Sequence, residues 1–398
     1  MDGDKHRFFV TCARGTEGAL RRELAAMRIA GAKGDKGGVW FEGPLTMAMG
    51  ACLHARVAVR VLLELATFDA VDAATLYAGA RAVDWRAWLT PASTFAVSAK
   101  LARDEAPALR HSGFAALKVK DAVADALRDA LGARPDVDPK DPDVSIVLHV
   151  AGTRAALFLD LAGPALHRRG YRVAMTEAPL KETLAAAVLA LGSVGHDAPS
   201  IRPFVDPMAG SGTLAIEHAM AARGLAPGLR RRFGFERWPT LGDAPRAAWG
   251  RLRAEAEAAA EAPRAPLPPI VCADISPEAV GAARQNASAA AVDDDITFEL
   301  ADVAALDRRW PRGVVCTNPP YGERLSTSST SDGVGPLYRR MGHAFMRLRG
   351  WSVVVLSGNP LFSRALPLKP VVSHRLYNGP LEVRLLRYEI PEAAPAPR

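Results

Sequence analysis

Apolar and polar positions divide the first 163 residues into two predicted α+β units. Short apolar runs predict strands, whereas apolar positions three or four residues apart predict helices. The first unit, residues 1–70, has the order β-α-β-α-β, and the second spans residues 71–163 and ends in a hairpin. The strands are expected at 8–11, 38–41, within 57–68, and at 94–101, 145–150 and 155–160, and the helices at 15–27, 45–55, 76–88 and 114–131.

A second pattern follows residue 164. Residues 164–192 are expected to form a linker and a helix over 179–191, which Thr176 would cap and Gly192 would end. Strands alternating with helices then predict an α/β fold, a doubly wound Rossmann-like parallel sheet over 193–391 with an insertion at 223–269. The strands are expected at 204–206, 270–274, 296–302, 313–318 and 352–357, followed by an antiparallel hairpin of 371–377 and 381–390. Residues 392–398 are expected to be a disordered tail.

Composition narrows the class of protein. The 398 residues carry a formal net charge of +7 and a pI near 9.4, which suits a polyanionic partner without identifying one. The four cysteines form no CxxC pair, so we expect no disulfide framework and no metal site, and a reducing cytoplasm fits best. The charged N-terminus and the lack of an apolar run of about 20 residues disfavour secretion and membrane spanning.

A glycine loop at the end of an expected strand is the first chemical signal. It reads Asp206-Pro207-Met208-Ala209-Gly210-Ser211-Gly212-Thr213 and leads into a helix whose free N–H groups would face a ligand. The two glycines let the backbone approach that ligand closely. The loop has neither the Lys of a phosphate loop nor the GxGxxG of a dinucleotide loop. Asp206 would repel a phosphate and suits a cationic or hydroxyl-bearing ligand, such as S-adenosylmethionine.

The tetrapeptide Asn318-Pro319-Pro320-Tyr321 follows a later strand and fits transfer of a methyl group to a base nitrogen. The Asn318 side-chain oxygen and the Pro319 carbonyl could accept both N–H bonds of an exocyclic amine and point its lone pair at the methyl group. Pro320 stiffens the turn, and Tyr321 could stack on the base. Taken alone, the four residues could also form an ordinary Asn-Pro turn.

Acidic residues also end two neighbouring strands. Asp274, followed by Ile275 and a Ser276 cap, is placed to bind ribose hydroxyls, and Asp302 could accept a bond from an adenine amine. The alternatives are that Asp274 caps a helix and that Asp302 is solvated.

Basic segments are candidates for RNA binding. Lys118 and Lys120 lie in the first turns of a helix that His111-Ser112-Gly113 opens, where they could bind phosphate or line a solvated face capped by Ser112. The linker contains Arg168, Arg169 and Arg172 around Tyr171 and could track RNA, with Tyr171 stacking, or form a basic hinge. In the insertion, arginines interleave with Phe233, Phe235 and Trp238, which could guide a nucleic acid, before a charged helix over 244–262.

These residues resemble a known family, the class I methyltransferases with an N-terminal THUMP domain, specifically the bacterial large-subunit (23S) ribosomal RNA guanine-N2 methyltransferases. The resemblance covers nearly the whole chain. It is carried by the glycine loop, the tetrapeptide, the 167–172 linker, the following Ala178-Pro179-Leu180-Lys181-Glu182-Thr183-Leu184-Ala185-Ala186, and Ala226-Pro227-Gly228-Leu229.

The resemblance implies a ferredoxin-like domain at 1–70 and a THUMP domain at 71–163, both binding RNA. It also implies that Asn318 and Pro319 position the guanine amine while Asp206, Asp274 and Asp302 hold S-adenosylmethionine with the glycines, without a metal. Some relatives carry a second methyltransferase domain; the sequence ends without one, so we expect a single activity. A transfer RNA guanine-N2 methyltransferase, an N6-adenine methyltransferase and a non-catalytic RNA-binding assembly factor remain alternatives. The oligomeric state is not predicted.

Overall fold

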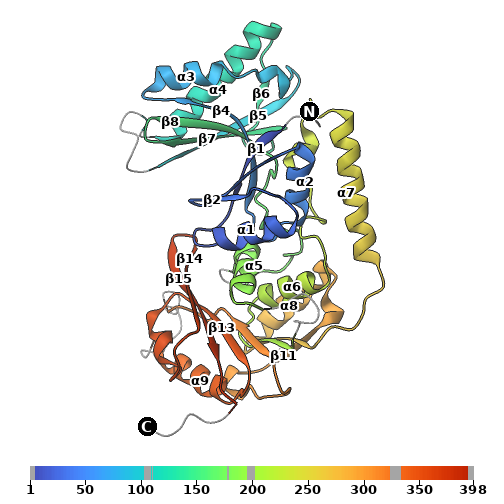
Figure 1. The fold of residues 1–398 in the computed structure, drawn as a ribbon, viewed down its shortest axis with the longest axis vertical. Helices are drawn as coiled ribbons and strands as arrows, with labels where there is room; N and C mark the ends of the chain where they lie inside the picture. The colour runs from blue at the N-terminus through green and yellow to red at the C-terminus, as the bar shows by residue number, and fades with distance from the viewer. Residues whose placement is uncertain are drawn as a thin grey trace. The chain divides into compact units, whose positions relative to one another are not determined.

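The computed structural model describes residues 5–102, 109, 111–176, 179–194, 202–322 and 333–392. It forms two compact units (Figure 1). The first contains Met1–Thr11, Leu24–Leu166 and Arg231–Glu255, and the second contains Cys12–Glu23, His167–Arg230 and Ala256–Arg398. The tail expected at 392–398 lies outside the described residues apart from Glu392. No helix within these ranges combines the length and the apolar character needed to cross a bilayer.

The first unit is built on one sheet of eight strands in the order β2-β3-β1-β4-β8-β7-β5-β6. The strands are β1 (His6–Thr11), β2 (Lys33–Asp35), β3 (Gly38–Gly43), β4 (Arg60–Asp69), β5 (Thr94–Leu101), β6 (Asp136–Val137), β7 (Val144–Ala151) and β8 (Arg154–Asp160). The two expected α+β units share this sheet, because β4 pairs antiparallel with β8 and Leu62 lies opposite Asp160. The expected hairpin is confirmed as β7 and β8. Sequence periodicity does not show pairing between distant strands, and β2 and β6 are too short to produce a pattern.

The helices of the N-terminal half are α1 (Glu17–Ala26), α2 (Leu45–His54), α3 (Ala73–Arg81) and α4 (Ser112–Leu131). Two expectations here are wrong. The helix expected at 76–88 begins at Ala73, because Asp72 accepts a hydrogen bond from the Thr75 N–H at 2.8 Å, and it ends at Arg81 before a 3₁₀ turn at Trp85–Ala87. Helix α4 begins at Ser112, with His111 at the cap position, so Ser112 does not cap it.

The second unit contains a sheet of seven strands in the order β11-β10-β9-β12-β13-β15-β14. The strands are β9 (Phe204–Asp206), β10 (Ile270–Asp274), β11 (Ile296–Leu300), β12 (Val314–Thr317), β13 (Ser352–Ser357), β14 (Val372–Asn378) and β15 (Leu381–Glu389). The helices are α5 (Glu182–Leu191), α6 (Thr213–Ala222), α8 (Pro277–Ala290) and α9 (Gly335–Met346). Strands β9 to β13 are parallel and β15 is antiparallel to β13 and β14, so the predicted Rossmann-like sheet with its final hairpin is confirmed.

The sheet fixes the place of the site. Strand β12 pairs in parallel with β9, with Val315 opposite Val205, so the loops that leave the two strands start at the same edge. Ligands of open α/β sheets bind at the carboxyl ends of such strands. The glycine loop after β9 and the tetrapeptide after β12 therefore meet there.

Two elements near this edge differ from expectation. The strand expected over 296–302 ends at Leu300, because Asp302 caps a 3₁₀ turn by accepting the Ala304 N–H at 2.8 Å. The helix expected from 179 begins at Glu182 with Lys181 at its cap position, so Thr176 does not cap it. Gly192 ends the helix as predicted.

The insertion forms a 3₁₀ turn (Gly234–Arg237) and α7 (Asp243–Glu261). Phe233, Phe235 and Trp238 are buried, and the two phenylalanine rings meet Trp249 edge-on at centroid distances of 5.4 and 5.0 Å. Buried rings cannot stack on a nucleic acid, so the prediction that these aromatic residues guide one is wrong. Their apolar surface is part of the core of the first unit.

Candidate functional site

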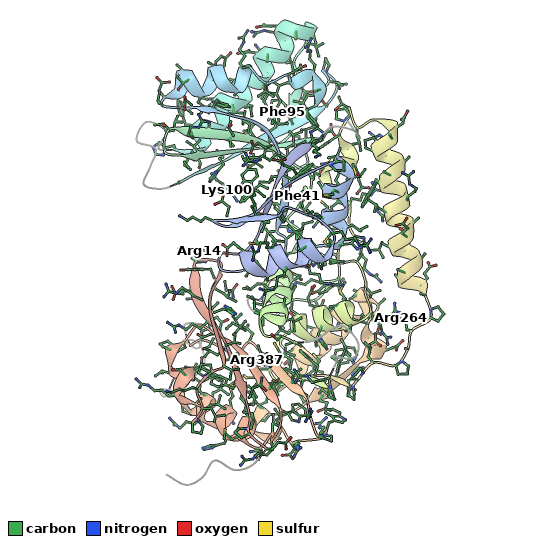
Figure 2. All side chains as sticks on the ribbon, in the orientation of Figure 1. Arg14, Phe41, Phe95, Lys100, Arg264 and Arg387 are labelled. Atoms are coloured by element: carbon green, nitrogen blue, oxygen red, sulfur yellow. The ribbon has the colours of Figure 1, made fainter. Side chains whose placement is uncertain are left out.

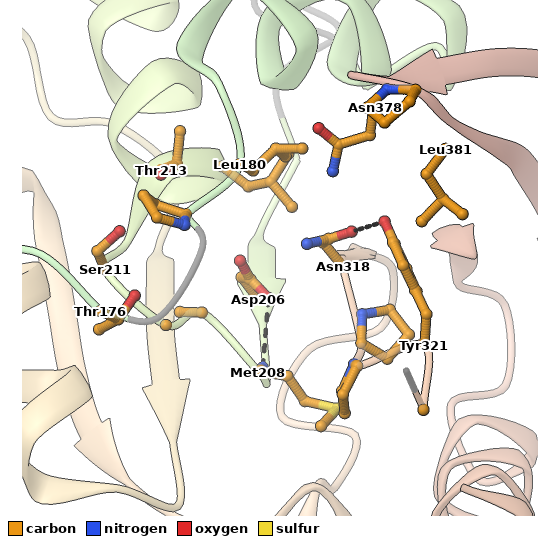
Figure 3. Close-up of a pocket in the computed structure, with 18 residues that line it drawn as sticks. Thr176, Leu180, Asp206, Met208, Ser211, Thr213, Asn318, Tyr321, Asn378 and Leu381 are labelled. Carbon is orange, nitrogen blue, oxygen red and sulfur yellow. Dashed lines mark hydrogen bonds between the residues drawn. The ribbon is translucent and has the colours of Figure 1, made fainter. Parts of the chain in front are cut away.

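A cavity of about 470 Å³ lies at the carboxyl ends of β9 and β12 (Figure 3). Four segments of the second unit line it. They are the glycine loop with Asp206, Met208, Ala209, Gly210, Ser211, Thr213 and Leu214; the tetrapeptide with Asn318, Pro319, Pro320, Tyr321 and Gly322; the linker with Thr176, Pro179 and Leu180; and the final hairpin with Asn378, Pro380 and Leu381. The structure thus brings together the two motifs that predicted a site. Asp274, Ile275 and Asp302 do not line this cavity.

The glycine loop needs its second glycine for two reasons. Gly212 has a φ of +83°, a conformation that is costly for other residues, and it is the cap residue of α6. A Cβ atom on Gly212 would also lie 2.9 Å from the Cβ of Ala283 in α8. Gly210 has a φ of +52°, but among the described residues a Cβ there would meet only the Thr176 hydroxyl, at 3.7 Å.

Asp274 connects β10 to the glycine loop. Its two carboxylate oxygens accept the Gly210 N–H at 2.8 Å and the Ser276 N–H at 3.0 Å. Ser276 caps α8 as predicted, accepting the Ala279 N–H at 3.1 Å. The adjacent Ile275 is 65% exposed, so it offers an apolar surface beside this carboxylate. Ribose binding by Asp274 stays a prediction.

The Asp302 carboxylate also accepts hydrogen bonds from groups of the protein. One carboxylate oxygen accepts the Ala304 N–H, and the other accepts Arg340 Nη1 at 3.0 Å. Contact between Asp302 and an adenine amine therefore stays a prediction, and it would require sharing a carboxylate that Arg340 already holds.

Asp206 is buried at the end of β9, with 1% of its surface exposed. Its carboxylate accepts the Met208 N–H at 3.3 Å. Burial raises the pKa of Asp206 from its usual 3.8 to about 7, because the charged form loses its hydration. A cation in the cavity would stabilise the ionised carboxylate.

The tetrapeptide is held by residues that the sequence did not single out. The Tyr321 hydroxyl donates a hydrogen bond to Asn318 Oδ1. The Tyr338 hydroxyl donates to the Pro320 carbonyl at 2.8 Å, and Asn359 Nδ2 donates to the Tyr321 carbonyl at 3.0 Å. A Cβ on Gly358 would lie 2.6 Å from the Tyr321 ring, so only glycine leaves room for the ring in this position.

Arg172 connects the linker to the glycine loop through hydrogen bonds. Its guanidinium donates to Glu182 Oε1 at 2.8 Å, Ser211 Oγ at 2.8 Å, Thr213 Oγ1 at 3.0 Å and the Leu180 carbonyl at 3.0 Å. Arg172 was predicted to bind RNA; in the structure its donors bind groups of the glycine loop, of the linker and of α5.

Asn286 on α8 also connects the linker to the glycine loop. Its side chain is fully buried. Its Oδ1 accepts the N–H groups of Val173 and Ala174, each at 2.9 Å. Its Nδ2 donates to the carbonyls of Ala174 at 2.9 Å and Ser211 at 3.1 Å. The sequence offered no signal for this role, because a polar residue in a helix is usually solvated.

Tyr171 and Arg169 are buried in the second unit. The Tyr171 hydroxyl donates to Glu217 Oε1 at 3.1 Å, and Arg169 Nε lies 3.5 Å from the same oxygen. The predicted stacking of Tyr171 on RNA is therefore wrong, and Arg169 is shielded from any phosphate. Arg168 is exposed.

The lysines predicted to bind RNA belong to α4 of the first unit, whereas the cavity belongs to the second. Lys118 Nζ lies 5.5 Å from the Phe114 ring centroid, and Lys120 Nζ lies 2.8 Å from Asp121 Oδ1. Their contact with RNA stays a prediction. Within the described ranges, no three His, Cys, Asp or Glu side chains gather in a way that could hold a metal ion.

Three family models match the chain. The RMKL-like methyltransferase domain matches residues 169–387, the THUMP domain 70–160 and the RlmL ferredoxin-like domain 7–62. The chain is 40% identical to the "Ribosomal RNA large subunit methyltransferase K/L" of Marinobacter nauticus and to that of Syntrophotalea carbinolica, covering 99% and 97% of this chain. It spans about half of each relative, 54% in both cases.

Two solved structures superpose on nearly the full length of this chain. A putative methyltransferase complexed with SAH superposes with a TM-score of 0.86 and 30% identity, covering 98% of this chain and 99% of the other. A predicted N6-adenine-specific DNA methylase from Listeria monocytogenes superposes with a TM-score of 0.84 and 32% identity, covering 98% and 97%. The chain therefore belongs to the RMKL-like methyltransferase family and combines that domain with a THUMP domain and an RlmL ferredoxin-like domain.

Proposed function

We propose that the protein uses S-adenosylmethionine to methylate the exocyclic N2 amine of a guanine in 23S ribosomal RNA. One observation carries the proposal: the glycine loop and the Asn318 tetrapeptide line the same cavity. The names of the ribosomal RNA methyltransferases that it resembles support the choice of RNA, although the chain spans only half of those proteins.

The residues present fit the cofactor. The cavity volume of about 470 Å³ lies within the range of small-molecule sites. The buried Asp206 carboxylate suits a cationic ligand, and the relative complexed with SAH supports the same cofactor here. Asp206, the 208–213 loop, Asp274 and Ile275 would hold it, with Asp302 at the adenine. When bound, it supplies an electrophilic sulfonium methyl group.

The tetrapeptide would orient the acceptor base. Asn318 Oδ1 and the Pro319 carbonyl would accept the two N–H bonds of the guanine amine, and Tyr321 would stack on the ring. An exocyclic amine is a weak nucleophile, so its orientation matters; positioning of this kind contributes up to roughly 7–11 kcal/mol. A paired guanine must first be exposed, which costs a few kcal/mol.

The N-terminal half would supply RNA affinity. We assign residues 1–70 and 71–163 to RNA binding, with Lys118, Lys120 and Arg168 as candidate phosphate contacts, and 193–391 to catalysis. Phosphate contacts would offset the cost of exposing the base. Ribosomal RNA as substrate places the reaction in the cytoplasm.

The test incubates the full chain with methyl-labelled S-adenosylmethionine and, separately, unmodified 23S ribosomal RNA, transfer RNA and duplex DNA. Mass spectrometry then identifies the labelled nucleoside. We expect N2-methylguanosine from ribosomal RNA. The same product from transfer RNA alone would change the substrate, and N6-methyladenine would refute the choice of base. Cofactor binding without transfer to any of the three would favour a non-catalytic RNA-binding factor.

A further inference from the structure

The edge strand β14 and the segment before it are rich in cations. Between Gly358 and Leu381 the sequence contains no Asp or Glu. The same stretch carries four exposed basic side chains, which are Arg364, Lys369, His374 and Arg375. Among the residues that the structure describes, strand β14 is the last strand of its sheet and has a neighbour on one side only. This edge therefore offers an accessible positive surface.

Two arginines of the hairpin lie directly opposite one another. In the antiparallel register of β14 and β15, Arg375 pairs with Arg384, and both are exposed. Like charges in this arrangement repel and destabilise a sheet. Arg375 Nε lies 3.3 Å from Glu382 Oε1, whereas Arg384 has no carboxylate partner within the part of the chain that the structure describes. Glu382, whose other oxygen accepts the Tyr377 hydroxyl at 3.2 Å, therefore pairs with Arg375 alone.

A third cation comes from the turn at residues 12–16, which belongs to the same unit. The Arg14 guanidinium lies 4.6 Å from the centroid of the Tyr377 ring; Figure 2 labels Arg14. Gly15 has a φ of +91°, and a Cβ there would lie 2.3 Å from the Arg375 carbonyl oxygen. The turn thus packs closely against β14 and places Arg14 over Tyr377, two positions after Arg375 on the same strand.

The tip of the same hairpin forms part of the cavity wall through Asn378, Pro380 and Leu381. Asn378 lies three positions after Arg375, which corresponds to about 10 Å along a strand. A base in the cavity would therefore leave its flanking RNA backbone within reach of these cations.

We propose that Arg14, Arg375 and Arg384 form a phosphate-binding edge that holds the RNA backbone next to the target base. The proposal rests on the proposed function for the identity of the polyanion. Cations on an edge strand can also serve only to prevent pairing with another sheet. Here two arginines lie opposite one another in the register and Arg14 lies over a ring of the same strand, so a phosphate is the counterion that would relieve the repulsion between Arg375 and Arg384.

The test measures the affinity of the full chain for a fluorescent, unmodified 23S ribosomal RNA transcript over a range of salt concentrations. Arg384→Gln and, independently, Arg375→Gln each remove one cation, while Arg384→Lys keeps the charge. Arg312→Gln is the matched control, because Arg312 is exposed at the amino end of β12, on the opposite edge from the cavity. Calorimetry with S-adenosylhomocysteine checks the cofactor site in each variant.

Each lost phosphate contact should reduce the slope of log affinity against log salt by about 0.7–0.9, which is roughly five- to eight-fold weaker binding at 0.1 M salt. We expect this change for Arg384→Gln and Arg375→Gln, near-normal slopes for Arg384→Lys and Arg312→Gln, and unchanged cofactor affinity throughout.

An unchanged slope in both glutamine variants would overturn the proposal and leave edge protection as the role of the arginines. Self-association of those variants with unchanged RNA affinity would do the same. If the slope changes as expected but the wild-type protein methylates no RNA, the phosphate-binding edge stands and the proposed function fails.

Discussion

The Tyr321 hydroxyl donates a hydrogen bond to Asn318 Oδ1, the atom that we assign to the guanine amine (Figure 3). The aromatic ring and the amide of the tetrapeptide are therefore linked before a base is bound. Asn318 Oδ1 has two lone pairs, so a base that enters with its own N–H donor either shares this atom with the hydroxyl or exchanges one hydrogen bond for another. The cost of that exchange depends on the tyrosine hydroxyl and can be measured by removing it.

Tyr321→Phe keeps the stacking surface and removes the competing donor. We expect its kcat/KM for RNA to stay within a few-fold of wild type, or to rise. Tyr321→Ala should lower kcat/KM by roughly 5- to 150-fold, because stacking on an aromatic side chain contributes about 1–3 kcal/mol per base. Steady-state methyl transfer to 23S ribosomal RNA checks both. A Phe variant as inactive as the Ala variant would mean that the hydroxyl itself is required.

Asn318→Ala and Asp274→Ala should separate base positioning from cofactor binding. We expect Asn318→Ala to abolish transfer while S-adenosylhomocysteine affinity stays within a few-fold of wild type. Asp274→Ala should weaken cofactor binding most, because it also leaves the Gly210 N–H without its acceptor. Calorimetry combined with single-turnover transfer measures both effects, and an equal loss of cofactor affinity in the two variants would refute this division of roles.

Cofactor affinity should depend on the protonation of Asp206, whose pKa burial raises to about 7. Below pH 7 the carboxyl is neutral and attracts a cation weakly. Affinity for S-adenosylmethionine should therefore fall as the pH drops through 7, by up to about tenfold per pH unit, and should level off above it. Calorimetry from pH 5.5 to 8.5 measures the profile. Asp206→Asn should bind weakly with a flat profile, and a flat profile in the wild type would contradict the assignment.

The same carboxyl should affect the stability of the protein without cofactor. An acid whose pKa is raised in the folded state binds its proton more tightly there, so the free energy of unfolding falls as the pH rises from about 4 to 7. Asp206→Asn removes this penalty and should melt at a higher temperature than wild type at pH 8, with a smaller difference at pH 5.5. Thermal melts without cofactor check the sign; a lower melting temperature at pH 8 would contradict it.

Arg172 should act on the cofactor loop, not on RNA. Arg172→Gln leaves Glu182, whose side chain is 5% exposed, without its cation, and breaking such a buried pair costs about 3–5 kcal/mol. We expect a lower melting temperature and weaker S-adenosylhomocysteine binding. RNA affinity and its salt dependence should stay unchanged.

Glu182→Gln in the Arg172→Gln background is the matched control, because it removes the orphaned charge and should restore part of the stability. If Arg172→Gln instead reduces the salt slope of RNA binding, the linker contacts RNA as the sequence had suggested.

The fold was predictable because alternation of strands and helices and the turn Asn378-Gly379-Pro380 are local signals. The burial of Tyr171 was not, since the Glu217 carboxylate that accepts its hydrogen bond lies far along the chain on α6. A basic segment with an aromatic residue resembles an RNA contact until that buried carboxylate is known. The structure shows which distant residues neutralise a local charge, and the sequence does not.

The residues that line the cavity were also only partly predictable from the sequence. The glycine loop and the tetrapeptide were identifiable, because each places special chemistry directly after a strand. Thr176 and Leu381 also line the cavity, yet nothing in their own neighbourhoods marks them. They line the cavity because the linker and the last hairpin form part of its wall. The positions of these two segments depend on strand order and packing, which local sequence does not show.

The two glycines of the loop should differ in what they tolerate. Gly210→Ala forces alanine into a left-handed conformation at a cost of about 1–2 kcal/mol, and the Thr176 hydroxyl is the one described group near its Cβ. Gly212→Ala has the same conformational cost and also brings a Cβ within 2.9 Å of Ala283, where overpacking costs a further 1–3 kcal/mol or so. We therefore expect Gly212→Ala to lower the melting temperature and cofactor affinity more. Glycine inside α8 costs about 1 kcal/mol by itself, so the reference is Ala283→Gly alone. Adding Gly212→Ala to Ala283→Gly should cost less than adding it to wild type by the overpacking part; an equal cost would mean that backbone conformation accounts for the whole loss.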